Sequence, residues 1–161
     1  MDPSRPGVPL KEFVVDASAL IHGLGGEEGS VEAAEFLFDQ RDQATLLAPG
    51  LLVWEIGNFA HGRTRRRADP DAASRQRLME DAIQGIQLEA PDVAALRQVA
   101  AIAEKYDLTF YDAAYLELAS RGPNRGLVTE DVALVRAGAQ VLGKRRVLCF
   151  GPRPREALAN A

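Results

Sequence analysis

The chain of 161 residues is 47% hydrophobic, and its 19 basic and 23 acidic residues give a net charge of −4. This length and composition suit one compact domain with a packed core, and they exclude a chain that is disordered throughout. The acidic balance argues against a nonspecific nucleic-acid coat, and no apolar run approaches the ~18 residues that cross a bilayer, so no membrane partner is expected.

The predicted elements follow a short lead in chain order. Residues 1–11 lack the continuous apolar core of a secretory signal, so we expect a flexible segment and a cytoplasmic protein. Apolar runs bounded by turn residues predict strands at residues 12–15, 45–48, 86–88, 126–129 and 147–150. Apolar residues at helical spacing predict helices at residues 31–40, 51–67, 71–84, 91–103, 110–120 and 132–136. Gly138 is expected to stop the last helix, and residues 151–161 to form a tail.

The alternation of strands and helices predicts an α/β fold. Such an order implies a mostly parallel sheet with helices on both faces and right-handed crossovers. In these folds the functional side chains gather at the carboxyl edge of the strands, near the point where the strand order reverses.

Four carboxylates stand where a predicted strand ends or a helix begins. Asp16 follows the apolar residues 13–15, and Glu55 lies one turn into the helix after the second strand. Asp112 lies near the start of the helix at 110–120, and Asp131 follows the fourth strand. Four acids in one small cleft repel each other unless a cation sits between them. The pattern therefore predicts a divalent metal site.

Mg²⁺ and Mn²⁺ are the ions that suit these ligands, because both prefer oxygen donors. Four carboxylates can hold one ion, or two ions about 3.5–4 Å apart. Such ions lower the pKa of a bound water and neutralise the charge that builds on a phosphate during cleavage. Phosphodiester hydrolysis would then require no Ser, Cys or His nucleophile.

Structural roles are the alternative for each of these residues. Asp16 could instead cap a helix, and Asp92 is expected to be a helix cap only. Glu55 fits that explanation poorly, because its apolar neighbours make a buried carboxylate unfavourable without a partner. The hydroxyls of Ser18 and Thr129 could bind a carboxylate or a metal-bound water, or could cap helices.

Two further polar residues adjoin the acids in sequence. Tyr115 lies one turn after Asp112, where it could border the site or belong to the core. Glu130 is next to Asp131, and because successive side chains should diverge there, Glu130 is expected to be a peripheral acid.

A basic run occupies the end of the helix predicted at 51–67. It contains Arg63, Arg65, Arg66 and Arg67. These side chains could hold RNA phosphates through contacts that weaken with salt, or could meet an acidic partner protein. The alternative is a solvated helix end, where arginines complement the helix dipole.

Taken in order, four segments resemble the PIN-domain nucleases. They are VVDASAL at residues 14–20, Glu55, YDAAYLELA at residues 111–119 and LVTED at residues 127–131. The resemblance covers residues 12–150, and the size of the chain resembles VapC-type toxins of toxin–antitoxin pairs. It implies a five-stranded parallel sheet in the order 3-2-1-4-5.

The same resemblance implies an activity and a set of site residues. Asp16, Glu55, Asp112 and Asp131 match the catalytic, metal-binding acids of the family, and Ser18 and Thr129 match its hydroxyl positions. The implied activity is a Mg²⁺- or Mn²⁺-dependent endoribonuclease that often acts on tRNA or rRNA. The implied partners are a second copy of the chain and a cognate antitoxin that blocks the site.

Two features depart from the family pattern. The segment at residues 23–30 is rich in glycine and acid, and it could alter the entrance to the site. No further acid follows shortly after Asp131, since residues 132–134 are Val, Ala and Leu. This departure places the stability of a second metal ion in question more than the activity.

Two other functions compete with the nuclease. The first is a PIN domain that binds RNA or assists RNA processing with little catalysis, although a pure binder has no need of four mutually repelling acids. The second is a metal-dependent phosphatase. It is disfavoured because Ser18 stands where an aspartyl-phosphate enzyme carries a second Asp, two residues after Asp16.

Overall fold

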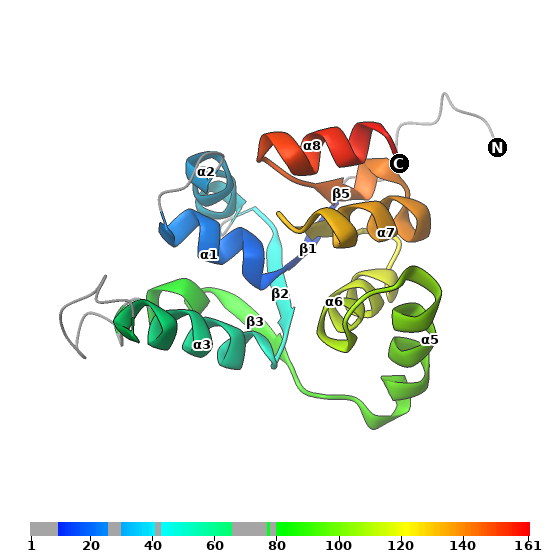
Figure 1. Cartoon of the computed structure of the whole chain (residues 1–161), viewed down its shortest axis with the longest axis horizontal. Coiled ribbons are helices and arrows are strands. Elements are labelled where there is room, and N and C mark those ends of the chain that lie inside the picture. Colours follow the sequence, from blue (N-terminus) through cyan, green and yellow to red (C-terminus); the bar gives the residue numbers. More distant parts are fainter. Residues whose placement is uncertain (1–9, 26–29, 41–42, 66–76, 78–79) are drawn as a thin grey trace.

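A five-stranded sheet in the order β3-β2-β1-β4-β5 forms the centre of the fold (Figure 1). The computed structural model describes residues 10–25, 30–40, 43–65, 77 and 80–161. Every neighbouring pair of strands is parallel. The strands are β1 (Glu12–Val15), β2 (Thr45–Pro49), β3 (Ile86–Glu89), β4 (Arg125–Val128) and β5 (Val147–Leu148). The predicted fold class and strand order are confirmed.

Helices flank the sheet on both sides. In Figure 1 α1, α2 and α3 lie on one side of the strands, whereas α5, α6 and α7 lie on the other. The α-helices are α1 (Ala17–Gly25), α2 (Ser30–Gln40), α3 (Leu52–Arg65), α5 (Leu96–Tyr106), α6 (Phe110–Ser120), α7 (Val132–Leu142) and α8 (Pro152–Ala159). Two 3-10 helices, η1 (Val93–Ala95) and η2 (Lys144–Arg146), precede α5 and β5. In the described part of the chain, no helix is long and apolar enough to cross a membrane.

The three central strands are buried on both faces. This is why their sequences read as continuous apolar runs rather than as an alternation. The buried strand residues are Phe13, Val14, Val15, Leu46, Leu47, Ala48, Leu127 and Val128. The edge strand β3 differs, because its residues are exposed or half-buried.

Gly138 lies inside α7, so the prediction that it stops this helix is wrong. A Cβ at this position would lie 3.0 Å from Leu127 Cδ2 and 3.1 Å from Val147 Cγ2. The glycine therefore lets the helix pack closely on the sheet. The helix ends at Gly143 instead, where φ is 87°, a backbone conformation that glycine adopts without strain.

Two helices occupy segments where the sequence predicts none. The first, α1, starts directly after Asp16, and its glycines weaken the local helical signal. Ala17, Ala19 and Leu20 are buried, so packing stabilises α1 where propensity does not. The second, α8, forms in the expected tail and packs against α7 (Figure 1). The helix predicted at 71–84 lies mostly outside the described residues. Within this range the structure describes residues 77 and 80–84, and 77 and 80–83 are helical.

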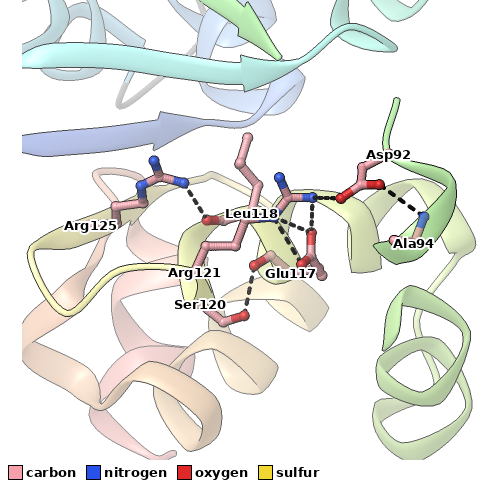
Figure 2. A network of polar contacts seen from close by, with 7 residues as sticks. All are labelled: Asp92, Ala94, Glu117, Leu118, Ser120, Arg121 and Arg125. Carbon is pink, nitrogen blue, oxygen red and sulfur yellow. Dashed lines mark hydrogen bonds and ion pairs between the residues drawn. The ribbon is translucent and has the colours of Figure 1, made fainter. Parts of the chain in front are cut away.

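A polar network ties the end of α6 to η1 (Figure 2). Arg121 Nε donates to both carboxylate oxygens of buried Glu117 at 3.0 Å. Arg121 Nη2 lies 4.0 Å from Asp92 Oδ2. Asp92 caps η1, as predicted, since its Oδ1 accepts from Ala94 N at 2.9 Å. The network lies between the last turn of α6 and the connection that leaves β3.

Candidate active site

The carboxyl edge of β2, β1 and β4 is the place where the four predicted acids meet. Asp16 follows the last residue of β1, and its backbone N–H donates to Val128 O at the end of β4 at 2.9 Å. Asp131 lies three residues beyond β4, at the start of α7. Glu55 lies in the first turn of α3 after β2, and Asp112 in the first turn of α6.

Asp16 lies at the centre of this group. The residue is 3% exposed, and its Oδ2 accepts from Thr129 Oγ1 at 2.8 Å and from Ser18 Oγ. Burial raises the pKa of Asp16 from 3.8 to about 6, although the two hydroxyls act to lower it. The charges of Asp112 and Asp131 also act to raise this pKa, and the value of about 6 includes their effect. The buried carboxylate is therefore close enough to both acids to sense their charge.

The two hydroxyls that bind Asp16 also accept hydrogen bonds from the backbone N–H groups of Glu130 and Asp131. Ser18 Oγ accepts from Glu130 N at 2.9 Å, and Thr129 Oγ1 accepts from Asp131 N at 3.0 Å. Thr129 is fully buried. Ser18 and Thr129 thus connect the loops after β1 and β4, and fix Asp16 relative to Asp131.

Glu55 is joined to Tyr115. The Tyr115 hydroxyl donates to Glu55 Oε2 at 2.6 Å, and the tyrosine ring is fully buried. Burial raises the pKa of Glu55, the tyrosine hydrogen bond lowers it, and the charges of Asp16 and Asp112 raise it again. Burial and the carboxylate neighbours raise the pKa of Tyr115 far above its usual value, so the phenol stays a donor. The two alternatives for Tyr115 are both realised, since it lies in the core and borders the site.

Asp131 caps α7, whereas Asp112 lies in the first turn of α6 and is bonded to Thr109, the residue that caps that helix. Thr109 Oγ1 accepts from Asp112 N at 3.1 Å and donates to Asp112 Oδ2 at 2.6 Å. Asp131 Oδ1 accepts from Leu134 N at 2.8 Å. The sequence analysis missed Thr109, although Thr followed three residues later by an acid is a capping-box pattern that could have identified it.

Each of the four carboxylates commits one oxygen to these contacts and leaves the other available. Among contacts within the described residues, Asp16 Oδ1, Glu55 Oε1, Asp112 Oδ1 and Asp131 Oδ2 accept no hydrogen bond. Across the same residues, no three His, Cys, Asp or Glu side chains are arranged to coordinate one ion directly. The donor set fits a hard cation that keeps several waters and binds one or two carboxylates.

Glu130 has a structural role that the sequence analysis missed. Its carboxylate is buried and accepts from Phe150 N at 2.7 Å and from Gly151 N at 2.8 Å. These bonds join the loop after β4 to the start of α8. Because the partners lie 20 and 21 residues away, no local sequence signal reveals them.

The predicted basic contact surface lies largely beyond what the structure describes. Arg63 and Arg65 belong to the last turn of α3, where only the backbone is described. Arg66 and Arg67 lie outside the described residues. Contact of these arginines with RNA or a partner stays a prediction.

Two cavities lie next to the elements that carry the acids. One, of about 520 Å³, includes Asp131 in its lining together with residues from α1 and from the start of α8. The other, of about 300 Å³, lies between η1, α5 and α6 and is lined mainly by apolar residues. None of the four acids lines the second cavity.

The comparisons with known proteins agree with the fold. A family model described as PIN domain matches residues 13–139. The chain belongs to the PIN domain family. PIN domains are generally nucleases, so the family supports an activity on nucleic acid. The match ends within α7, so β5 and α8 lie beyond it.

A solved structure supports the PIN fold independently. PAE2754 from Pyrobaculum aerophilum is 24% identical, with a TM-score of 0.62 over 96% of this chain and 100% of that one. At this identity the likeness shows a shared fold alone. A comparison with curated proteins finds no match.

Proposed function

We propose that this PIN domain is a metal-dependent endoribonuclease and the toxin component of a toxin–antitoxin pair. The observation that carries the nuclease is the buried carboxylate of Asp16, held by two hydroxyls and coupled by charge to the other acids. Burying a carboxylate among like charges is unfavourable, so the arrangement makes sense when a cation joins it. The toxin role rests on the resemblance to VapC-type proteins.

The proposed cofactor is Mg²⁺ or Mn²⁺, as one or two ions. Asp16, Glu55, Asp112 and Asp131 would hold it, one or two of them directly and the others through its bound waters, with the four oxygens that no described residue occupies. When bound, such an ion supplies a water of lowered pKa and neutralises charge on the phosphate. The departure after Asp131, where residues 132–134 carry no acid, favours one firmly held ion.

The other polar residues act by positioning these carboxylates. Ser18 and Thr129 fix the rotation of the Asp16 carboxylate. Tyr115 holds Oε2 of Glu55 in place and keeps its own proton because its pKa is raised. Such supporting contacts commonly change metal affinity or activity by about 10–100-fold when they are lost.

The proposed substrate is RNA, with tRNA or rRNA as candidates, and the proposed partners are a cognate antitoxin and a second copy of the chain. The alternative function is an RNA-binding or RNA-processing accessory with little catalysis. One observation favours this alternative: within the described residues no three acids are arranged to coordinate a single ion. If a bound cation draws three of these acids together, this observation no longer favours the alternative.

Cleavage of total RNA by the purified protein tests the proposal. The reaction is run in Mn²⁺ or Mg²⁺, beside EDTA and beside an Asp16→Asn variant. The matched control is Asp92→Asn, because Asp92 is an exposed cap outside the site and Asn retains the cap. Discrete fragments that disappear with EDTA and with Asp16→Asn, but persist with Asp92→Asn, support the nuclease. Fragments that persist in EDTA would reject it.

A further inference from the structure

The larger cavity places a wall that carries one arginine, Arg153, beside one of the four acids. Its lining comes from three separate parts of the chain: His22 on α1, residues 130–132 after β4, and residues 151–154 at the start of α8. Its volume of about 520 Å³ lies within the range of roughly 300–1,000 Å³ that is typical of small-molecule sites. Because Asp131 belongs to this lining, the cavity adjoins the candidate active site at that acid.

Arg153 supplies the positive charge of this wall. Its side chain is exposed, and within the described residues it forms no ion pair. A guanidinium suits a phosphate, since its planar set of donors can bind two oxygens at once. Arg153 is therefore available to an anionic ligand that reaches Asp131.

The backbone that carries Arg153 is held in place on both sides. Pro152 and Pro154 flank it in the first turn of α8, and proline fixes φ. The preceding Gly151 donates its N–H to Glu130 Oε2 at 2.8 Å. Glu130 is itself buried, so the wall is anchored to the loop that ends in Asp131. This anchoring reduces the conformational entropy that a ligand must remove.

We propose that this cavity binds the nucleotide of single-stranded RNA that adjoins the cleaved bond, with Arg153 holding its phosphate and His22 contacting its base. The inference rests on the proposed function and deepens it. A nucleotide splayed out of a single strand can enter such a cavity, and an imidazole is one of the side chains on which bases stack. Arg153 lies beyond residues 13–139, the segment that the family model matches.

The first test is binding of the four ribonucleoside 5′-monophosphates, in Mg²⁺, followed by backbone amide NMR shifts. We expect shifts at residues 131–132 and 151–153, and a dissociation constant at least fivefold higher for Arg153→Ala. The matched control is Arg145→Ala, because Arg145 is an exposed arginine that lines a different cavity. Shifts that avoid these residues, or equal weakening by both variants, would overturn the inference.

Two further readouts separate a nucleotide site from a simple anion site. We expect His22→Ala to weaken the monophosphates but not inorganic phosphate. We also expect Arg153→Ala to raise KM for RNA cleavage while kcat changes less than twofold. Equal affinity for inorganic phosphate and for every monophosphate would reduce the cavity to an anion site and overturn the inference.

The outcomes also distinguish this inference from the proposed function. Metal-dependent RNA cleavage without nucleotide binding in the cavity would reject the cavity site and leave the nuclease standing. Nucleotide binding in the cavity without any RNA cleavage would support the site and count against the nuclease. Absence of both would reject both.

Discussion

The Tyr115 hydroxyl donates to Glu55 Oε2 at 2.6 Å and so joins α6 to α3 across 60 residues of sequence. The contact links a fully buried ring to a half-buried carboxylate. It therefore connects the core of the PIN domain directly to the orientation of one acid. Loss of the Tyr115 hydroxyl should therefore lower the activity more than the stability of the fold.

Tyr115→Phe tests this link. We expect it to lower the rate of metal-dependent RNA cleavage by about 10-fold or more, because Glu55 loses its orienting donor. The same hydrogen bond lowers the pKa of Glu55, so its loss should move the acid limb of the pH–rate profile to higher pH. The matched control is Tyr111→Phe, on the same helix but exposed. Identical profiles for the two variants would contradict the assigned role.

The raised pKa of Asp16 predicts how stability depends on pH. The folded protein holds this proton with a pKa of about 6, whereas the ordinary value is 3.8. Between these values the folded state binds more protons than the unfolded chain, so the free energy of unfolding falls as pH rises. The full loss is about 3 kcal/mol at 1.36 kcal/mol per pKa unit, and it is complete above pH ~7. Urea unfolding of the metal-free protein from pH 4 to 8 measures it.

The Asp16→Asn variant is the control for that titration. Asn keeps an acceptor for the two hydroxyls but cannot carry the charge. We expect the variant to lose most of the pH dependence between pH 4 and 7, and to be at least as stable as the wild type at pH 8. Added Mn²⁺ should stabilise the wild type and not the variant, because a ligand stabilises only the state that binds it. A variant much less stable than the wild type at pH 8 would point to a structural role for the charge.

Thr129→Val removes a buried hydroxyl and keeps the shape. Asp16 loses a donor and the Asp131 N–H loses its acceptor, so we expect a loss of about 1–3 kcal/mol in unfolding free energy. Cleavage should fall by about 10–100-fold, because both acids lose their support. Thr129→Ser retains the hydroxyl and should retain most of the activity. If serine fails as completely as valine, the methyl group matters rather than the hydrogen bonds.

Glu130→Ala tests the anchor of α8. It leaves the N–H groups of Phe150 and Gly151 without their acceptor, so we expect a loss of about 2–4 kcal/mol. Hydrogen exchange at these two amides should accelerate. Glu156→Ala, an exposed acid on α8, is the matched control and should change neither quantity. Unaltered exchange at both amides in Glu130→Ala would show that other contacts hold the segment.

The elements that the sequence predicts well are those whose signal is local. The central strands are continuous apolar runs because they are buried on both faces. Asp16 and Asp131 could be placed at the carboxyl edge of the sheet from the sequence. Asp16 directly follows β1, and Asp131 lies three residues after β4. Parallel pairing then brings the ends of those strands together.

The roles of Glu130 and Gly138 could not be predicted from the sequence, because they depend on residues distant in the chain. Glu130 looks like a second surface acid, yet its partners are the backbone groups of Phe150 and Gly151. Gly138 carries the usual signal for a helix end, yet it is the point where α7 approaches Leu127 and Val147. In both cases tertiary packing decides, and neither contact leaves a trace in neighbouring residues.

The most direct test of the account measures cleavage of a labelled RNA substrate by four single variants. They are Asp16→Asn, Glu55→Gln, Asp112→Asn and Asp131→Asn, with Asp92→Asn as the control outside the site. The account predicts that each of the four loses about 100-fold or more of the Mn²⁺-dependent rate, while Asp92→Asn stays within twofold of the wild type. Wild-type cleavage rates in correctly folded Asp16→Asn and Asp112→Asn would contradict the central claim that these carboxylates carry the reaction.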